Sequence, residues 1–294
     1  MSQKLLVTGA AGQLGQRVIS HLVETYRVAP AQIVAATRHP DKLSALAVAG
    51  VNVRKADFDE PGSLSAAFAG VDRLLLISTD ALDKPGRRLA QHKAAIEAAG
   101  KAGVKHVVYT SMPNAESSVV TFAPDHLETE RALAASGLGW TVLRNAWYME
   151  NLFMALPAVL ASGKWFTSSG EGRIPYIARE DCARAAAAVL VADGTTNTRY
   201  DITGAQAYSR AEIAALVTQV SGKPIEVVQV SDEQLVQGLT AAGIPGFFVP
   251  TLVSFDTNTR LGYFDLVSED VRKLTGRAAQ SLRDFLLASK GALK

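Results

Sequence analysis

The sequence predicts an α/β protein built around a doubly wound parallel sheet, and three observations lead to this fold class. Short apolar runs rich in β-branched residues alternate with longer segments of helical periodicity over the first half of the chain. Runs this apolar are typical of strands buried on both faces, as in sheets whose parallel strands are joined by helices. A glycine-rich turn separates the first run from the first helical segment. With 294 residues, 48% of them hydrophobic, the chain can bury a large core.

The elements follow one another regularly up to residue 145. Six strands are expected: KLLVTG (4–9), QIVAATR (32–38), VNVRKADF (51–58), DRLLLIS (72–78), KHVVYTS (105–111) and GWTVLRN (139–145). Five helices are expected between them, at 12–26, after Pro40, at 64–68, at 85–102 and at 124–135, the last ended by Gly137. This alternation forces parallel pairing with right-handed crossovers, which is the Rossmann arrangement.

Beyond residue 145 the alternation loosens, which indicates a smaller C-terminal lobe interwoven with the first. We expect a helix at REDCARAAAAVLV (179–191) and a strand at RYDIT (199–203) that is able to rejoin the sheet. A second helix, SRAEIAALVTQVSG (209–222), begins with a Ser209 cap and precedes a strand at PIEVVQV (224–230). The segment AAGIPGFFVPTLVSF (241–255) has glycine and proline breakers among bulky apolar residues, which favours a lid or a pocket wall.

Composition argues against several classes of partner. Thirty basic and 28 acidic residues leave a net charge of +2 with no long basic run, so neither nucleic acid nor an anionic membrane surface is expected as a partner. No apolar run approaches the ~18 residues of a membrane span, and the first strand starts too early for a signal peptide. The single cysteine and the scattered histidines predict neither an internal disulfide nor a metal site. We expect a cytoplasmic protein.

The turn after the first strand carries the strongest motif, G-x-x-G-x-x-G at Gly9, Gly12 and Gly15. The first glycine permits a tight turn, the second lets backbone N–H groups approach a pyrophosphate, and the third allows close helix packing. The helix N-terminus adds partial positive charge. A tight turn without a ligand is the alternative, but the βαβ context favours dinucleotide binding. The expected contacts are Gly9, Ala10, Ala11, Gly12, Gln13, Leu14 and Gly15.

This motif defines two regions. We assign residues 1–145 to an NAD(P)-binding Rossmann domain and residues 146–294 mainly to a substrate-binding lobe, with strands after residue 195 able to rejoin the first region.

The end of the second predicted strand indicates which dinucleotide is bound. An NAD site usually has an acidic residue there to bind the ribose 2′-hydroxyl. This chain has Thr37 and Arg38, and no carboxylate before Asp41. A guanidinium can bind a 2′-phosphate through two hydrogen bonds, so we predict NADP(H) as the cofactor. A solvated surface arginine is the alternative for Arg38.

Further cofactor contacts are expected where other strands end, because ligands lie beyond the carboxyl ends of parallel strands. Asp57 and Phe58 follow the third strand and are placed to contact adenine. Ile77, Ser78 and Thr79 follow the fourth and are placed beside a ribose. Polar residues at strand ends also serve as caps, so each assignment has a structural alternative.

These residues resemble the short-chain dehydrogenase/reductase superfamily, in its atypical NmrA-like branch. The matching segments are VTGAAGQLG, ATRHPDK, LLLIS, GVKHVVYTS, HLETE, LRNAWYMEN and RAEIAALVTQVSGKPIEVVQVS, which together span residues 4 to about 232. Within the branch the chain is most like the type 2 NAD(P)H:quinone oxidoreductases and the triphenylmethane dye reductases. The resemblance implies that the backbone of Val142, Leu143, Arg144 and Asn145 lines the nicotinamide.

The chain departs from the superfamily at its Tyr-x-x-x-Lys motif. Aligning the glutamate that follows that motif with Glu130 puts Phe122 at the tyrosine and His126 at the lysine. A phenyl ring cannot donate a proton, so the usual acid is absent. His126 is a candidate proton donor or ribose ligand, because an ordinary imidazole pKa lies in the useful range. A lone helical histidine is, however, more often structural.

The missing tyrosine favours acceptors that need no strong acid. Quinones and cationic dyes spread the incoming charge through a conjugated system, whereas an unactivated ketone needs a donor at its oxygen. Asn145 is a candidate donor to a substrate oxygen, with a helix cap as the alternative. Trp147 and Tyr148 are candidate walls for a planar substrate, with core packing as the alternative.

We therefore predict NADPH-dependent reduction of a small quinone-like substrate by direct hydride transfer. Two alternatives stay open: a redox sensor of the NmrA-like type that binds NAD(P) without turnover, and a reductase of dyes or nitroaromatics. The oligomeric state is also open, a homodimer being one outcome.

Overall fold

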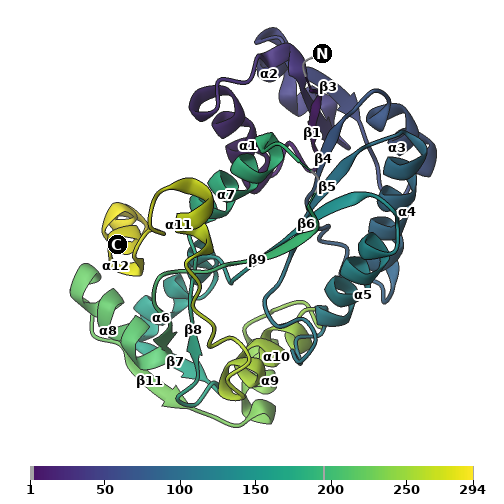
Figure 1. Cartoon of the computed structure of the whole chain (residues 1–294). Coiled ribbons are helices and arrows are strands. Elements are labelled where there is room, and N and C mark those ends of the chain that lie inside the picture. The colour runs from purple at the N-terminus through teal and green to yellow at the C-terminus, as the bar shows by residue number, and fades with distance from the viewer. Residues whose placement is uncertain (1–2, 195, 294) are drawn as a thin grey trace.

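The computed structural model, which describes residues 3–194 and 196–293, has a seven-stranded parallel sheet at its centre (Figure 1). Its strands are β1 (Leu5–Val7), β2 (Ile33–Thr37), β3 (Asn52–Lys55), β4 (Arg73–Leu76), β5 (His106–Ser111), β6 (Gly139–Asn145) and β9 (Thr198–Ile202). They pair in the order β3-β2-β1-β4-β5-β6-β9, and every neighbouring pair is parallel. The strand order changes direction between β1 and β4, as in a doubly wound sheet. The predicted fold class is confirmed.

Alternating side chains bury both faces of this sheet. In β1, Leu5 and Val7 belong to one apolar core and Leu6 to the other. The first core is completed by α1 (Gln13–Ser20, continued by a π-helical turn His21–Thr25), α7 (Arg179–Val191) and α11 (Asp270–Thr275). The second is completed by α3 (Pro61–Phe68), α4 (Arg87–Lys101) and α5 (Ala123–Ala134). The short α2 (Ser44–Val48) follows a 3₁₀ turn at Pro40–Leu43.

A smaller lobe with its own apolar core lies beyond the β9 edge in Figure 1. Two small sheets cross this lobe, one pairing β7 with β11 in parallel and one pairing β8 with β10 in antiparallel. Its elements are α6 (Leu156–Ser162), β7 (Lys164–Thr167), β8 (Arg173–Ile174), β10 (Tyr208–Ser209), α8 (Arg210–Ser221), β11 (Glu226–Gln229), α9 (Asp232–Ala241), α10 (Val249–Arg260) and α12 (Leu282–Ala288), with 3₁₀ turns at Met149–Met154 and Lys290–Leu293. Another 3₁₀ turn, Pro30–Gln32, precedes β2.

The two regions share elements. The helix predicted at 179–191 forms as α7 and packs on the large sheet, and the strand predicted at 199–203 forms as β9 beside β6. The predicted Ser209 cap is present: Ser209 Oγ accepts from Glu212 N–H (3.3 Å), and the Glu212 carboxylate accepts from Ser209 N–H (2.8 Å). Residues after 145 therefore contribute to the large sheet as well as to the smaller lobe.

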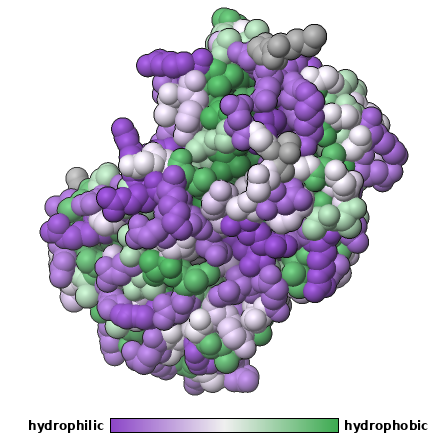
Figure 2. Space-filling model, viewed as in Figure 1, coloured by the Kyte–Doolittle hydropathy of each residue, from purple (hydrophilic) through white to green (hydrophobic). Residues whose placement is uncertain are grey.

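On the face shown in Figure 2, apolar residues form separate patches among hydrophilic ones. Within the part of the chain that the structure describes, no helix has the length and apolar character that crossing a bilayer would require.

Candidate functional site

The glycine turn lies between β1 and α1 and has the shape that a phosphate group needs. Gly9 has a φ of +58°, a conformation that favours glycine. A Cβ on Gly15 would lie 2.9 Å from the Ala10 Cα, so only glycine lets α1 pack this closely on the turn. A Cβ on Gly12 would meet the Gly9 carbonyl oxygen at 3.1 Å and, its own chain neighbours aside, no other described atom within 4 Å, so the space above the turn is open.

The start of α1 is also suited to an anion. Gly12 is its N-cap, no side chain caps the helix, and its first turn has no acidic residue. The first N–H groups of a helix lack intrahelical partners and carry partial positive charge, so they are available to a pyrophosphate. The geometry of Gly9, Gly12 and Gly15 therefore fits a dinucleotide.

The end of β2 presents an exposed arginine. Arg38 lies next to the buried Thr37, and its positive charge acts on the nearby Asp59. Asp59 accepts hydrogen bonds from Arg87 (2.6 Å) and Gln91 (2.9 Å), and these bonds lower its pKa to about 2. This acid is thus already bonded, which leaves the exposed Arg38 guanidinium accessible to a phosphate.

The residues after β3 are partly buried. The Asp57 carboxylate accepts from Asp59 N–H (3.0 Å), while Asp57 N–H donates to Ser63 Oγ (2.9 Å). Phe58 packs against the core beneath α3 and α4. Contacts of Asp57 and Phe58 with adenine stay a prediction.

The position expected for the superfamily lysine is occupied by a fully buried histidine. His126 Nε2 accepts from Arg88 Nη2 (2.9 Å), so its proton is on Nδ1, which donates to Tyr109 Oη (2.9 Å). Desolvation and the positive charge of Arg88 place the pKa of His126 well below its usual value. This contradicts our expectation of an ordinary imidazole pKa. A bond from His126 to a ribose hydroxyl would require one of its present partners to leave.

Phe122, at the position of the superfamily tyrosine, belongs to an aromatic wall. Its ring centroid lies 5.7 Å from that of His126 and 5.8 Å from that of Phe255 on α10. Phe255 in turn lies 3.9 Å, centroid to centroid, from Trp147. The predicted wall residue Trp147 is therefore joined by two rings that come from α10 and from the start of α5.

The other site residues expected in and after β6 have different surroundings. Asn145 Nδ2 donates to the Tyr148 hydroxyl (3.3 Å), and the buried Asn145 Oδ1 has no hydrogen-bond partner among the residues described. The Tyr148 ring stacks under the Arg179 guanidinium at 4.8 Å. Val142, Leu143 and Arg144 are buried inside β6 and paired on both sides, whereas Asn145, the last residue of the strand, is only partly buried and lies nearest to any ligand.

The Arg144 side chain enters a partly buried ion-pair network that the sequence did not indicate. Its guanidinium donates to the fully buried Glu130 (2.7 Å) and to Glu116. Glu130 also accepts from Arg199 Nε (3.1 Å) and from Ser111 Oγ (2.6 Å). Because the Ser111 hydroxyl proton points at a carboxylate, it is not free to donate to a substrate oxygen.

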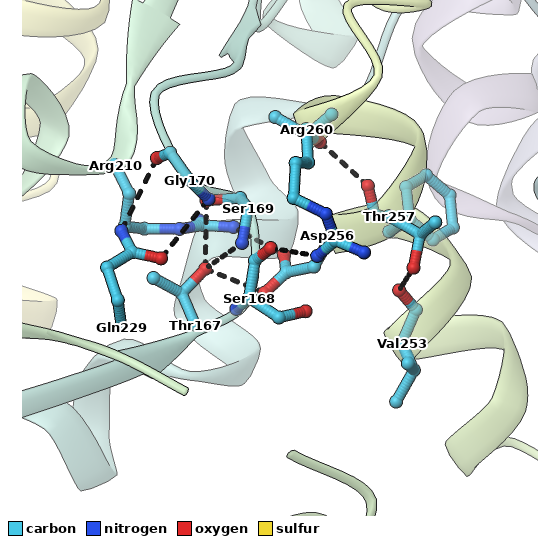
Figure 3. Close-up of polar contacts among 12 residues, drawn as sticks. Thr167, Ser168, Ser169, Gly170, Arg210, Gln229, Val253, Asp256, Thr257 and Arg260 are labelled. Atoms are coloured by element: carbon cyan, nitrogen blue, oxygen red, sulfur yellow. Dashed lines mark hydrogen bonds and ion pairs between the residues drawn. The ribbon is translucent and has the colours of Figure 1, made fainter. Parts of the chain in front are cut away.

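Helix α10, which carries Phe255, is fastened to the rest of the lobe. Figure 3 shows Asp256 facing the end of β7, where its carboxylate accepts from Thr167 Oγ1 (2.6 Å) and from the N–H of the following residue, Ser168 (2.9 Å). The same carboxylate pairs with Arg210 Nη2 at 3.0 Å. Of the two interpretations of segment 241–255, these bonds favour a pocket wall over a lid. Another side of α10 lines an apolar pocket of ≈ 520 Å³ together with α9.

Among the residues that the structure describes, no group of three or more His, Cys, Asp or Glu side chains could hold a metal ion.

Comparison with known proteins adds independent findings. Residues 1–281 match the model of the NmrA-like family. The chain is 38% identical over 280 residues to quinone oxidoreductase 2 of Escherichia coli, a match that covers 95% of this chain and 96% of the relative. Its fold is similar to a crystal structure of an NADPH-dependent quinone oxidoreductase of Escherichia coli complexed with NADPH, with a TM-score of 0.91, 37% identity and coverage of 97% and 99% of the two chains.

A second similar structure is the triphenylmethane reductase of Citrobacter sp. complexed with NADP(H). The TM-score is 0.90 at 36% identity, and the match covers 98% of this chain and all of the other.

Proposed function

The chain belongs to the NmrA-like family, and we propose that it is an NADPH-dependent oxidoreductase that reduces quinones and similar conjugated acceptors by direct hydride transfer. The observation that carries this proposal is that an aromatic wall adjoins the carboxyl edge of the sheet where each nearby candidate acid is occupied or buried. The relatives that reduce quinones and dyes with NADPH support it.

The cofactor would lie across the carboxyl ends of β1, β2, β4 and β6. The turn from Gly9 to Gly15 would hold the pyrophosphate, and Arg38 would bind the 2′-phosphate. Asp57 and Phe58 would contact adenine, the segment 77–79 a ribose, and the end of β6 at Asn145 the nicotinamide. When bound, NADPH supplies a hydride from its nicotinamide ring.

The acceptor would lie against the apolar rings of Trp147 and Phe255, whose centroids are 3.9 Å apart and whose planes are tilted by 42°. Asn145 would donate to an acceptor oxygen. A quinone takes up one hydride and one proton to give the hydroquinone, and its conjugated ring system spreads the charge before the proton arrives. Water therefore suffices as the proton source, and the protein contributes mainly proximity and orientation.

Burial explains why this site would not reduce an unactivated ketone. The Tyr109 hydroxyl is fully buried and hydrogen-bonded to His126, and desolvation raises its pKa. Ser111 donates to Glu130, and Phe122 has no proton to give. A developing alkoxide would find only the amide of Asn145, which is a weak acid.

The similarity to the triphenylmethane reductase favours cationic dyes as a second class of acceptor at the same site. A redox sensor that binds NADPH without turnover is the competing function. A homodimer and a cytoplasmic location are also part of the proposal, and light scattering on the purified protein would test the first.

The deciding experiment follows NADPH absorbance at about 340 nm with a panel of quinones, triphenylmethane dyes and simple ketones. We expect turnover with quinones or dyes and none with ketones. Tight NADPH binding without turnover of any acceptor would replace the reductase by the sensor, and ketone reduction would show that an acid had been overlooked.

A further inference from the structure

The three residues after β4, Ile77 to Thr79, have every backbone amide held by a side chain that is itself buried. Ile77 N–H donates to Thr8 Oγ1 (2.9 Å), and Ser78 N–H donates to Thr110 Oγ1 (2.9 Å). Thr8 follows β1 and Thr110 lies in β5, the two strands that flank β4. The first two residues of the segment are therefore fixed by the neighbouring strands.

Thr79 is held by α4 alone. Its N–H donates to His92 Nε2 (3.0 Å), and its carbonyl accepts from Arg88 Nε (2.7 Å). Arg88 and His92 are four residues apart, so they project from the same side of the helix. Two side chains of one helix thus hold both peptide groups of one residue.

Burying the Arg88 guanidinium beside Thr79 costs desolvation free energy. It is only 5% exposed, and a buried guanidinium is costly unless it is paired and fully hydrogen-bonded. Its nearest carboxylate oxygen, Asp125 Oδ2, is 4.0 Å away, and its Nη1 has no hydrogen-bond partner within the described parts of the chain. Its remaining bond is to His126 Nε2. A leucine at this position would avoid these costs, so the bond to Thr79 calls for a functional explanation.

His92 acts as a hydrogen-bond acceptor towards Thr79. Because its Nε2 accepts from a backbone N–H, the proton of the neutral ring lies on Nδ1, within 3.0 Å of Thr129 Oγ1. Desolvation and the charge of Arg88 lower the pKa of His92 to about 3, so the ring keeps this acceptor at neutral pH.

We propose that Arg88 and His92 are positioning residues for the dinucleotide, which fix the Thr79 peptide groups so that the segment 77–79 is ready to receive the cofactor. This inference rests on the proposed cofactor site. Neither side chain is required to touch NADPH, because each acts through the backbone of Thr79. Removing this clamp, the pair Arg88 and His92, lets the Thr79 backbone move in the free protein. NADPH must then order the segment 77–79 as it binds, which weakens its binding free energy.

A matched control lies at the opposite end of the same strand. Arg73 begins β4 and is 4% exposed, and its guanidinium donates to the carbonyls of Leu190 (2.9 Å) and Val189 (3.2 Å) in α7. It is therefore a buried arginine that clamps backbone carbonyls, as Arg88 is, but at the amino edge of the sheet, away from the ligand edge.

The experiment measures the Kd for NADPH and the melting temperature of the full-length protein with Arg88→Lys, Arg73→Lys, His92→Leu and His92→Gln. Lysine keeps the charge but cannot reach both Thr79 and His126, and glutamine can present an oxygen where His92 Nε2 stands. We expect Arg88→Lys and His92→Leu to raise the Kd about tenfold or more, with kcat at saturating NADPH nearly unchanged. Arg73→Lys should lower the melting temperature but keep the Kd within about twofold. His92→Gln should bind NADPH more tightly than His92→Leu, with a Kd near that of the wild type.

The inference is overturned if Arg88→Lys and Arg73→Lys change the Kd equally, or if His92→Leu binds NADPH as the wild type does. Should Arg88→Lys fail to fold, the two His92 variants decide alone: loss in His92→Leu without recovery in His92→Gln would indicate a packing defect and reject the clamp. A wild type that binds NADPH but reduces no acceptor would remove the proposed function and leave this inference standing.

Discussion

Acidification should destabilise the folded protein, because the fold buries histidines in their neutral form. His92 and His106 are at most 1% exposed, and desolvation lowers their pKa to about 3 and about 4 respectively. An unfolded histidine has a pKa of about 6.5. Between the folded and unfolded values the unfolded chain binds more protons, so its free energy falls relative to the folded state as the pH drops. Stability is thus complete above about pH 6.5 and decreases below it.

The size of the effect follows from these values. Each pH unit between the two pKa values costs about 1.4 kcal/mol per histidine. From about pH 7.5 to about pH 5, His92 and His106 should each remove about 2 kcal/mol, or about 4 kcal/mol together, from the free energy of unfolding. His126, whose pKa is also lowered by burial, adds to the loss in the same direction. For a domain with a typical stability of about 5–15 kcal/mol this is a large fraction.

Urea denaturation at a series of pH values measures this slope, and His92→Gln isolates one histidine because the amide does not titrate. The variant should lose about 2 kcal/mol less than the wild type over the same range. Acidic residues that change stability near pH 5 act equally in both proteins and cancel in the difference. Identical slopes for the wild type and His92→Gln would refute the burial of a neutral imidazole at this position.

Three further predictions concern the proposed site. Arg38→Ala should raise the Kd for NADPH about 30- to 150-fold, the loss of about 2–3 kcal/mol from charge-assisted bonds to the 2′-phosphate, and leave NADH within about twofold; equal weakening of both cofactors in titrations would remove Arg38 from that phosphate. Gly12→Val should abolish cofactor binding, because the new side chain would fill the open space above the turn; a normal Kd would reject the pyrophosphate assignment. Phe122→Tyr should be unnecessary for quinone turnover, and a wild type that is inactive until this tyrosine is introduced would show that the acceptor needs an acid.

The parts of the fold that the sequence could predict are those specified by local pattern. The glycine turn at Gly9–Gly15 and the apolar strands show their periodicity over a few residues. The Ser209 cap lies three residues from its partner Glu212. In contrast, β7 and β11 are four-residue strands, partly exposed, that pair across about 60 residues of chain, so neither has a pattern strong enough to predict its partner.

The candidate site divides along the same line. Residues that would contact a ligand through the backbone, such as Gly12, belong to a short motif that the sequence alone displays. Arg88 was not, because it lies in an alanine-rich helix where a basic residue ordinarily faces solvent, and only the folded chain brings it to Thr79 and His126. His126 was identified by position, but its pKa is lowered first by its burial in the fold and then by the charge of Arg88, which is 38 residues away.

These contacts bear on why a site of this composition would suit acceptors that need no acid. The carboxyl edge of the sheet has a tyrosine, a serine and two histidines close by, a set from which general acids are commonly drawn. Each is bonded inward: Tyr109 to His126, Ser111 to Glu130, and His92 to Thr79. These hydrogen bonds instead join β5 to α5 and the segment after β4 to α4. We infer that side chains which could otherwise donate a proton instead fix the backbone beneath the cofactor. Such a site suits an acceptor whose own electron affinity makes an acid unnecessary.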